Sequence, residues 1–440
     1  MSLTAAGAVF ASAYVALAVL PTAIALVADP FAAPRPWWTD AGMAIGLIAF
    51  PVILMQFALV SRLGPVSRPF GSDALLSFHR QMAMLALVFV FAHAAAAAGV
   101  RWRLWLPFAA PRAITWGAAA FWGLVAIALT SFARQQLHLS YEAWRRIHLA
   151  LAVLIAGGSV AHLLAVNGYS AATPMRWLIG VYTALFLVLL LRYRLLRPLW
   201  LGQTPWVLTA NDEAGGRSRL LRVQPDGHRG FRFEPGQFAW LITGGSPLSA
   251  QQHPLSIASS AERSPDQAIE FLVKAQGDWS GTTVPSLAPG ARVWVDGPFG
   301  AFTPERIAAA GFVFLAGGIG IAPIRSMLLT MRDRRDTQPV ILFYAAADRQ
   351  RAVMADELES LGNSLAWTVV FVFEEAGPEW PGERGRLNAD LLRRHLPAPY
   401  ATFHYFICGP PGMIDATESL LIDTLAVPAA HVHTERFQVV

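Results

Sequence analysis

HRQMAMLALVFVFAH at residues 79–93 and HLALAVLIAGGSVAH at residues 148–162 are two apolar stretches that each begin and end with histidine. In both stretches the two histidines are fourteen residues apart. In an α-helix this spacing returns to nearly the same face and separates the imidazoles by about 21 Å along the axis. Both stretches are therefore predicted to be helices that carry one histidine near each end of a shared face.

An imidazole inside hydrocarbon is costly and marks a functional position by default. Two such helices side by side would pair His79 with His148 and His93 with His162. A hydrogen bond to a neighbouring helix could explain one of these histidines, but two pairs with identical spacing favour a shared use. Histidine is a common axial ligand of haem iron, so the pairs predict two stacked haems, each held from both sides.

The composition indicates that part of the chain lies in a membrane. Hydrophobic residues make up 55% of the 440 residues and charged residues only 14%, with a mean hydropathy of +0.43. Uncharged stretches that can span about 30 Å of hydrocarbon predict a six-helix transmembrane bundle over residues 1–198. The first of them lacks a basic start, which favours a membrane helix over a cleaved signal peptide. The stretches are 1–28, 41–61, 81–100, 113–133, 147–175 and a shorter sixth, 177–191.

The distribution of arginine predicts the orientation of this bundle. Nine arginines fall on the side that carries the C-terminal half and five on the opposite side, so the positive-inside rule puts the C-terminal half in the cytoplasm. The expected location is the inner (plasma) membrane, with the lipid bilayer as partner. The basic residues form no cluster with interleaved aromatics, which argues against a nucleic-acid partner. No segment indicates an obligate protein partner, and the single cysteine, Cys408, excludes an intrachain disulfide.

After Pro198 the pattern changes to short alternating runs with frequent glycine and proline. Five strands are predicted, and they fit a small antiparallel β-barrel over residues 203–305. From about Gly311 strands alternate with helices, which predicts an α/β domain with a parallel sheet over residues 308–440. The expected barrel strands are 206–209, 220–223, 238–242, 269–273 and 292–295. The expected α/β elements are strands 312–316, 340–345, 367–373 and 403–408, with helices 323–332 and 351–361.

Several short motifs occur in this C-terminal half in a fixed order. The glycine turn Gly317–Pro323 follows a predicted strand and opens a helix, which suits a pyrophosphate, although alone it is a weak signal. Any one of the other segments could be a loop, but their shared order is hard to explain by chance. They are Pro235–Phe238, His253–Ser260, Val273–Thr282, Asp296–Gly300, Cys408–Met413 and Glu435–Phe437.

With these motifs, residues 203–440 resemble the ferredoxin–NADP reductase-type flavoprotein module. Together with the paired histidines, the whole chain resembles the NADPH oxidase/ferric reductase superfamily. The resemblance implies an oxidoreductase with FAD, two b-type haems and NADPH as cofactors, with NADH as an open possibility. The haem ligands would be His79, His93, His148 and His162.

The resemblance also implies roles for individual residues of the C-terminal half. Ser256 would bond the flavin near N5, Cys408 would lie beside the nicotinamide, and Phe437 would cover the flavin; these are the expected catalytic residues. The FAD-binding residues would be His253, Pro254, Leu255, Ser256, Lys274, Gly277, Trp279, Ser280, Gly281 and Thr282. The nicotinamide nucleotide would contact Gly317, Gly318, Gly320, Pro323, Cys408, Gly409 and Pro410.

The coenzyme is less sharply indicated. Arg349 and Arg351 follow the second strand of the α/β domain and could bind a 2′-phosphate, whereas Asp348 would repel it. These residues favour NADPH slightly over NADH.

The parts imply a direction of electron flow. A hydride carries two electrons and haem iron accepts one, and flavin can handle both. The expected acceptor is a small molecule on the far side of the membrane, either dioxygen, which would become superoxide, or a ferric chelate. A reductase of a periplasmic partner protein, and a six-helix channel or transporter with a regulatory nucleotide-binding domain, are the alternatives.

Overall fold

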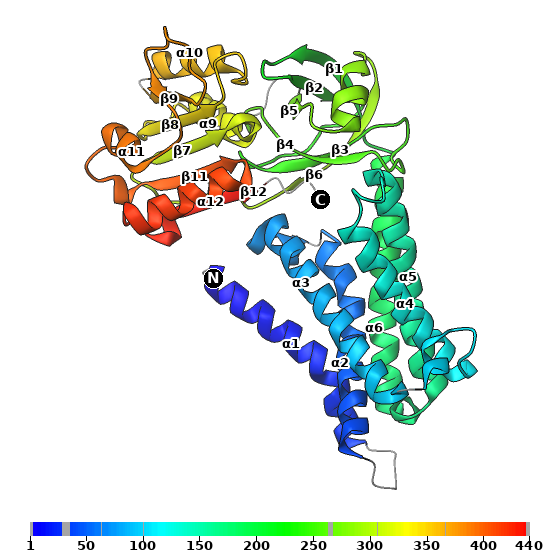
Figure 1. The fold of residues 1–440 in the computed structure, drawn as a ribbon. Helices are drawn as coiled ribbons and strands as arrows, with labels where there is room; N and C mark the ends of the chain where they lie inside the picture. Colours follow the sequence, from blue (N-terminus) through cyan, green and yellow to red (C-terminus); the bar gives the residue numbers. More distant parts are fainter. Residues whose placement is uncertain are drawn as a thin grey trace. The chain divides into compact units, whose positions relative to one another are not determined.

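The computed structural model describes residues 3–28, 36–62, 64–99, 101–262, 267–305, 307–365 and 367–436. The chain divides into two compact units, Met1–Pro198 and Leu199–Val440. The first unit is helical and the second contains two β-sheets (Figure 1).

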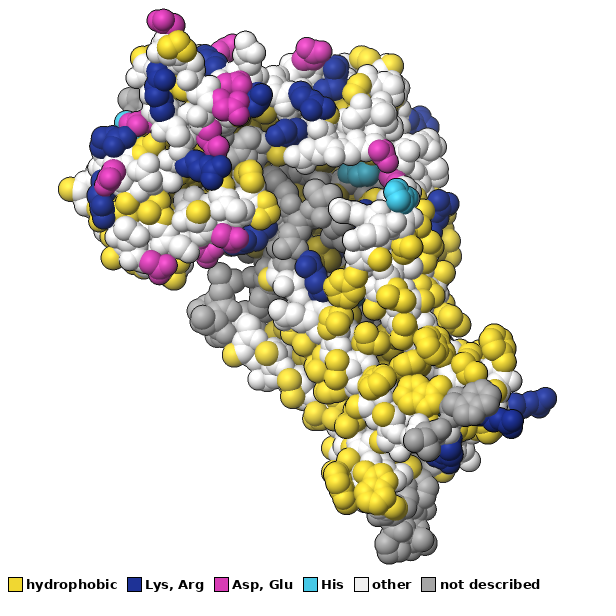
Figure 2. All heavy atoms as spheres, viewed as in Figure 1, with side chains coloured by type: hydrophobic (Ala, Val, Ile, Leu, Met, Phe, Trp, Pro, Cys, Tyr) yellow, Lys and Arg dark blue, Asp and Glu magenta, His cyan; other side chains and the backbone are white. Residues whose placement is uncertain are grey.

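Among the described residues of the first unit, six helices are long and apolar enough to cross a membrane, as predicted. On the face that Figure 2 shows, apolar side chains cover most of the described surface of these helices, whereas charged side chains gather on the second unit. Apolar side chains that would be exposed to water are stable there only against lipid, so this unit is a membrane domain. Its helices are α1 (Leu3–Val27), α2 (Trp37–Val60), α3 (Gly64–Ala98), α4 (Arg112–Phe132), α5 (Tyr141–Val166) and α6 (Thr173–Leu191).

Three helix boundaries differ from the predicted stretches by about nine residues or more. The predicted fifth stretch, 147–175, was wrong at its end: α5 stops at Val166 because Asn167 adopts a left-handed conformation with φ of 49°. Helix α3 begins at Gly64 rather than at residue 81. An uncharged run indicates the part of a helix that can lie in the hydrocarbon, and the helix itself can extend beyond that part. The sixth span is also longer than predicted, because α6 continues through a π-helical turn, η3 (Arg192–Leu196), into α7 (Arg197–Leu201).

The first sheet of the second unit is an antiparallel barrel, as predicted. Its strand order is β4-β3-β6-β1-β2-β5, and a bridge between Ile257 and Phe271 joins the two ends of that order. Trp206, Leu221 and Phe271 fill its interior and are almost completely buried. The strands are β1 (Pro205–Glu213), β2 (Ser218–Pro225), β3 (Phe238–Ile242), β4 (Gln252–Ser256), β5 (Ile269–Lys274) and β6 (Arg292–Phe299).

The second sheet is parallel throughout, with strand order β10-β9-β8-β7-β11-β12. Helices α9 and α10 contribute to the core on one face, and α11 and α12 to the core on the other. This sandwich confirms the predicted α/β fold. The strands are β7 (Phe312–Gly317), β8 (Val340–Ala346), β9 (Thr368–Phe373), β10 (Glu383–Arg384), β11 (His404–Gly409) and β12 (Val432–Arg436). The helices are α9 (Ile321–Arg334), α10 (Ala355–Leu365), α11 (Ala389–His395) and α12 (Pro411–Ser419).

The helix predicted at 351–361 begins later, at Ala355. Residues 351–354 form a turn instead, because the backbone N–H of Val353 donates to the hydroxyl of the buried Tyr344 rather than to a helix carbonyl. Sequence reasoning also missed β4, which is the strand that carries His253 and Ser256.

Candidate electron-transfer site

The structure brings the four membrane histidines together in two pairs. His79 on α3 faces His148 on α5 with ring centroids 6.4 Å apart, and His93 faces His162 with centroids 6.2 Å apart. We call His79/His148 the near pair, because it lies toward the end of the bundle at which α6 ends, and His93/His162 the far pair. The pairing predicted from spacing is the pairing observed.

These distances fit one metal atom between the two rings of each pair. With metal–nitrogen bonds of about 2 Å, two axial imidazoles hold their centroids roughly 6 Å apart. In the far pair, Nδ1 of each ring bonds a backbone carbonyl, so Nε2 is the nitrogen that can ligate a metal. In the near pair, Nδ1 of His79 and of His148 is buried without a hydrogen bond among the described residues. A haem iron therefore fits both pairs.

In the barrel, β4 and the segment after β5 place the predicted FAD-binding residues. His253 on β4 stacks on Trp279 with ring centroids 3.8 Å apart. The indole N–H of Trp279 donates to Thr243 at 2.9 Å, which fixes the tryptophan. At the end of β4, the Ser256 hydroxyl is buried and has no hydrogen-bond partner among the described residues. A buried hydroxyl without a partner is costly, so it suits a hydrogen bond to a bound flavin.

The second predicted FAD segment, Gly277–Thr282, includes most of a π-helical turn, η4 (Trp279–Thr283). The hydroxyl of Ser280 accepts from the backbone N–H of Gln276 and of Gly277 at 3.0 Å each. The Thr282 hydroxyl donates to the Asp278 carbonyl. Both hydroxyls thus stabilise the turn itself.

The predicted pyrophosphate turn lies at the carboxyl ends of two neighbouring parallel strands, β7 and β11. Gly318 has a φ of +53°, which favours glycine. A Cβ at Gly320 would collide with the Cys408 carbonyl, and one at Gly317 would lie 2.8 Å from Pro410. The two predicted nucleotide motifs, the glycine turn and Cys408–Pro410, therefore pack against each other at the sheet edge where nucleotides bind in such folds.

Two side chains from other elements reach this glycine turn. The buried Tyr344 on β8 donates its hydroxyl to the Gly318 carbonyl at 3.1 Å, and burial raises the pKa of Tyr344. Lys274 at the end of β5 places Nζ 3.8 Å from the point where a Cβ of Gly318 would lie. The barrel thus supplies a positive charge beside the turn, as suits a phosphate. The role of Tyr344 was not predicted from the sequence, because this tyrosine lies inside an ordinary apolar strand.

The remaining predicted residues differ in how the structure places them. The Cys408 side chain is fully buried, so it meets the site through its backbone. Arg349 pairs with Asp356 and Glu359, and Arg351 pairs with Asp348 and Glu375. A 2′-phosphate would compete with these carboxylates for either arginine. Phe437 lies outside the described residues.

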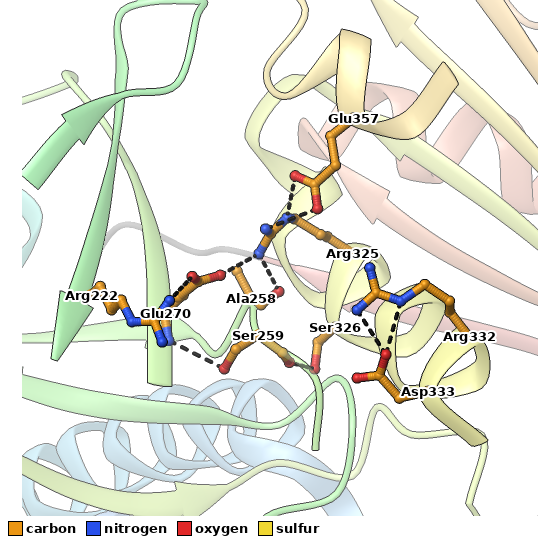
Figure 3. Close-up of polar contacts among 9 residues, drawn as sticks. All are labelled: Arg222, Ala258, Ser259, Glu270, Arg325, Ser326, Arg332, Asp333 and Glu357. Carbon is orange, nitrogen blue, oxygen red and sulfur yellow. Dashed lines mark hydrogen bonds and ion pairs between the residues drawn. The ribbon is translucent and has the colours of Figure 1, made fainter. Parts of the chain in front are cut away.

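An arginine that sequence reasoning missed connects the barrel to the parallel sheet. Arg325 on α9 is 5% exposed and donates to the Ala258 carbonyl and to Glu270 of the barrel, each at 2.8 Å (Figure 3). Its other nitrogens make two bonds of 3.0 Å to Glu357 on α10. Burial alone would lower the pKa of Arg325, but Glu357 and Glu270 outweigh burial and raise it. The guanidinium therefore links the barrel to the parallel-sheet domain through hydrogen bonds and ion pairs; we call this link the Arg325 tie.

A polar cavity of about 410 Å³ opens beside this tie. Its lining includes Arg222, Glu270, Arg325, Arg332 and Glu357.

Comparison with known proteins covers both units. A ferric reductase like transmembrane component matches residues 45–159, an FAD-binding domain matches 217–303, and an oxidoreductase NAD-binding domain matches 314–419. Ferredoxin–NADP reductase B of Sorangium cellulosum is 32% identical over 230 residues, which cover 50% of this chain and 91% of that protein. The chain belongs to the NADPH oxidase/ferric reductase superfamily. Its C-terminal half is a ferredoxin–NADP reductase-type module that binds FAD and NAD(P)H.

Other relatives of this superfamily member match the C-terminal half. The reductase component of propane 2-monooxygenase from Mycolicibacterium smegmatis is 30% identical over 225 residues, 49% of this chain and 62% of that protein. The FAD/NAD-binding domain of nitric oxide dioxygenase from Vibrio cholerae is 18% identical, with a TM-score of 0.48 over 53% of this chain and 98% of that one. The ferric reductase match and the ferredoxin–NADP reductase relative make the chain a membrane oxidoreductase that transfers electrons, and the ferric reductase match includes His79, His93 and His148.

Proposed function

We propose that this protein carries electrons across a membrane from NAD(P)H, through FAD and two bis-histidine haems, to dioxygen, which becomes superoxide. One NAD(P)H gives up a hydride, which is two electrons, and a proton is released when those electrons move on singly. Two dioxygen molecules each take one electron. The balance is one NAD(P)⁺, one proton and two superoxide ions for each NAD(P)H.

The observation that carries this proposal is that one membrane domain contains two histidine pairs. Centroid distances of 6.4 Å and 6.2 Å suit one iron per pair, and the fourteen-residue spacing puts the pairs about 21 Å apart along the helices. Two sites at that separation divide the width of a bilayer of about 30 Å into short steps. A channel or transporter would have no use for this arrangement.

In the C-terminal unit, the chain's own residues would bind and orient the nicotinamide nucleotide and FAD. The glycine turn at Gly317–Gly320 opens a helix, which suits a pyrophosphate, and Lys274 supplies a charge beside it. The Ser256 hydroxyl is held in a buried position where it can bond the flavin edge. FAD, when bound, supplies the step from two-electron to one-electron transfer.

At the far side, histidine on both faces of each iron would leave no open coordination position. An acceptor would then be reduced at the haem edge without binding iron, which suits dioxygen. The match to a ferric reductase like transmembrane component favours a ferric chelate as the second candidate acceptor. A partner protein on the far side would be reduced in the same way.

The proposed orientation follows from charge. Arginine is more frequent in the loops on the side of the C-terminal half, so the FAD and NAD(P)H sites would face the cytoplasm of an inner membrane. The near pair would then be the inner haem site and the far pair the outer one.

The test is superoxide production by the purified, FAD-loaded protein given NADPH in air, measured as dye reduction that superoxide dismutase abolishes. A fast, dismutase-sensitive signal supports the proposal, and parallel runs with NADH report the coenzyme preference. If the absorbance spectrum shows that the haems become reduced but the dismutase-sensitive dye reduction is negligible, dioxygen is not the acceptor. Ferric citrate is then added to the reduced protein without oxygen, and reoxidation of the haem spectrum measures electron transfer to it.

A further inference from the structure

The far pair of histidines is held by the backbone of two neighbouring helices. Nδ1 of His93 lies 2.9 Å from the Gly42 carbonyl oxygen on α2, and Nδ1 of His162 lies 3.2 Å from the Ala113 carbonyl oxygen on α4. Each carbonyl can only accept, so each imidazole donates from Nδ1. The other ring nitrogen, Nε2, is then the metal-binding nitrogen in both rings.

One helical turn after each of these carbonyls stands a glycine against the same ring. A Cβ at Gly46 would lie 2.5 Å from Nδ1 of His93 and 2.9 Å from its Cε1. A Cβ at Gly117 would lie 2.7 Å from Nδ1 of His162 and 2.9 Å from its Cε1. Distances under 3.0 Å force a shift, and here the neighbour is a planar ring rather than the end of a flexible chain.

The two arrangements have the same design although their sequences differ. In each hairpin, α2–α3 and α4–α5, the carbonyl residue and the glycine are four apart on one helix and the histidine is on the next. The spacing of four places both on one helix face. Two independent occurrences of the same spacing indicate a requirement of the histidine pair rather than a packing accident.

The near pair lacks the two glycines of this arrangement. His79 lies fourteen residues before His93 on α3. Because α2 runs antiparallel to α3, the position on α2 that corresponds to His79 lies fourteen residues after Gly46, at Val60. The corresponding step on α4 leads from Gly117 to Ser131. Neither is glycine. Nδ1 of His148 makes no hydrogen bond within the described residues, whereas His79 interacts with the backbone of Gln56, fourteen residues after Gly42.

We propose that Gly46 and Gly117 are positioning residues that fix the rotation of the two far-pair imidazoles and thereby set the reduction potential of the haem they hold. This proposal rests on the haem ligation proposed above. The carbonyl fixes the tautomer and raises the basicity of the ligand, and the glycine lets the ring press against the helix. A more basic axial ligand favours ferric iron, so this arrangement lowers the potential of the far haem relative to one with rotated rings.

The test uses the full-length protein with Gly46→Ala or Gly117→Ala. Haem content is measured by absorbance, potentials by spectroelectrochemical titration, and ligand orientation by the g values of the ferric haems in electron paramagnetic resonance. His93→Leu identifies which signal belongs to the far haem. We expect each alanine variant to shift the g values of that signal and raise its potential, with the near haem unchanged.

Two glycines on neighbouring helices provide matched controls. A Cβ at Gly157 on α5 or at Gly180 on α6 would meet no described atom within 4 Å, so Gly157→Ala and Gly180→Ala should change neither haem. The proposal is overturned if Gly46→Ala and Gly117→Ala keep the wild-type far-haem signal, or if they perturb both haems equally. If one variant is not recovered from the membrane, the other decides by the same criterion. Absence of haem from the wild-type protein would instead refute the proposed function.

Discussion

Arg325 on α9 donates to Glu270 on β5 at 2.8 Å, and this contact joins the parallel sheet to the barrel. The arginine comes five residues after Gly320, at the start of the helix that follows the glycine turn. The turn is therefore anchored to the barrel through a short, rigid piece of helix. That anchoring gives a physical link between the nucleotide turn and the predicted flavin residues of β4.

Replacing Arg325 with methionine should destabilise the C-terminal unit. Removing Arg325 from this buried charged network takes away the arginine that bonds Glu357 and leaves Glu270 with the more distant Arg222 at 3.6 Å, and we expect a loss of about 3 kcal/mol. Thermal unfolding followed by the release of FAD fluorescence measures the effect. Arg332→Met is the control, because Arg332 is 42% exposed and, among the described residues, forms an ion pair with its neighbour Asp333. Equal melting temperatures for the two variants would contradict the role of Arg325 as a tie.

Gly320→Ala should block the use of NAD(P)H while FAD remains bound. A Cβ there meets the Cys408 carbonyl, which is backbone in a central strand and cannot move aside. We expect a KM for NAD(P)H raised about tenfold or more, with a normal bound-flavin spectrum. Stopped-flow reduction of the flavin measures it. Gly412→Ala provides the control, since no described atom lies within 4 Å of its Cβ position. Normal flavin reduction by Gly320→Ala protein would rule out this turn as the nucleotide site.

Substituting single histidines should separate the two haem sites. His93→Leu is expected to remove the far haem and leave flavin reduction by NAD(P)H intact. His148→Leu is expected to stop electron delivery to the far haem. Haem content and the reduced-minus-oxidised spectrum measure both. Unimpaired turnover by the His148→Leu protein would contradict the proposed path.

The C-terminal unit should lose stability as the pH falls from about 6.5 to about 4. Burial, and then the neighbouring His404 and His431, lower the pKa of His433 to about 4. Between that value and the ordinary pKa of about 6.5, the unfolded chain binds a proton that the folded chain does not. This stabilisation is therefore complete above about pH 6.5 and is lost as the pH falls through the window.

Melting temperatures of the full-length protein across this pH range test that expectation. His433→Asn removes the titrating ring and should flatten the dependence. His433 also bonds His404 at 3.0 Å, so the variant should melt lower at pH 7. A wild-type melting temperature that does not change between pH 7 and pH 4 would contradict the assignment.

Local patterns were sufficient for much of this fold. The fourteen-residue spacing of the histidines predicted both the helices and the pairing, because helix periodicity alone determines which face a residue occupies. The alternation of strands and helices after Gly311 predicted the parallel sheet in the same way. Helix ends were less predictable, since α5 ends at a left-handed Asn167 inside an uncharged run.

The residues that only the tertiary structure could identify act across long sequence separations. Arg325 lies 55 residues from Glu270, and Gly46 lies 47 residues from His93, so no local pattern links them. A glycine in an apolar helix or a tyrosine such as Tyr344 in an apolar strand reads as ordinary packing until its neighbour is known. The sequence by itself determined the membrane helices, the histidine pairs and the order of the nucleotide motifs, because these depend on periodicity and composition. Contacts between elements decided which glycines, carbonyls and charges hold those groups in place, because complementarity of shape and charge exists only once the chain has folded.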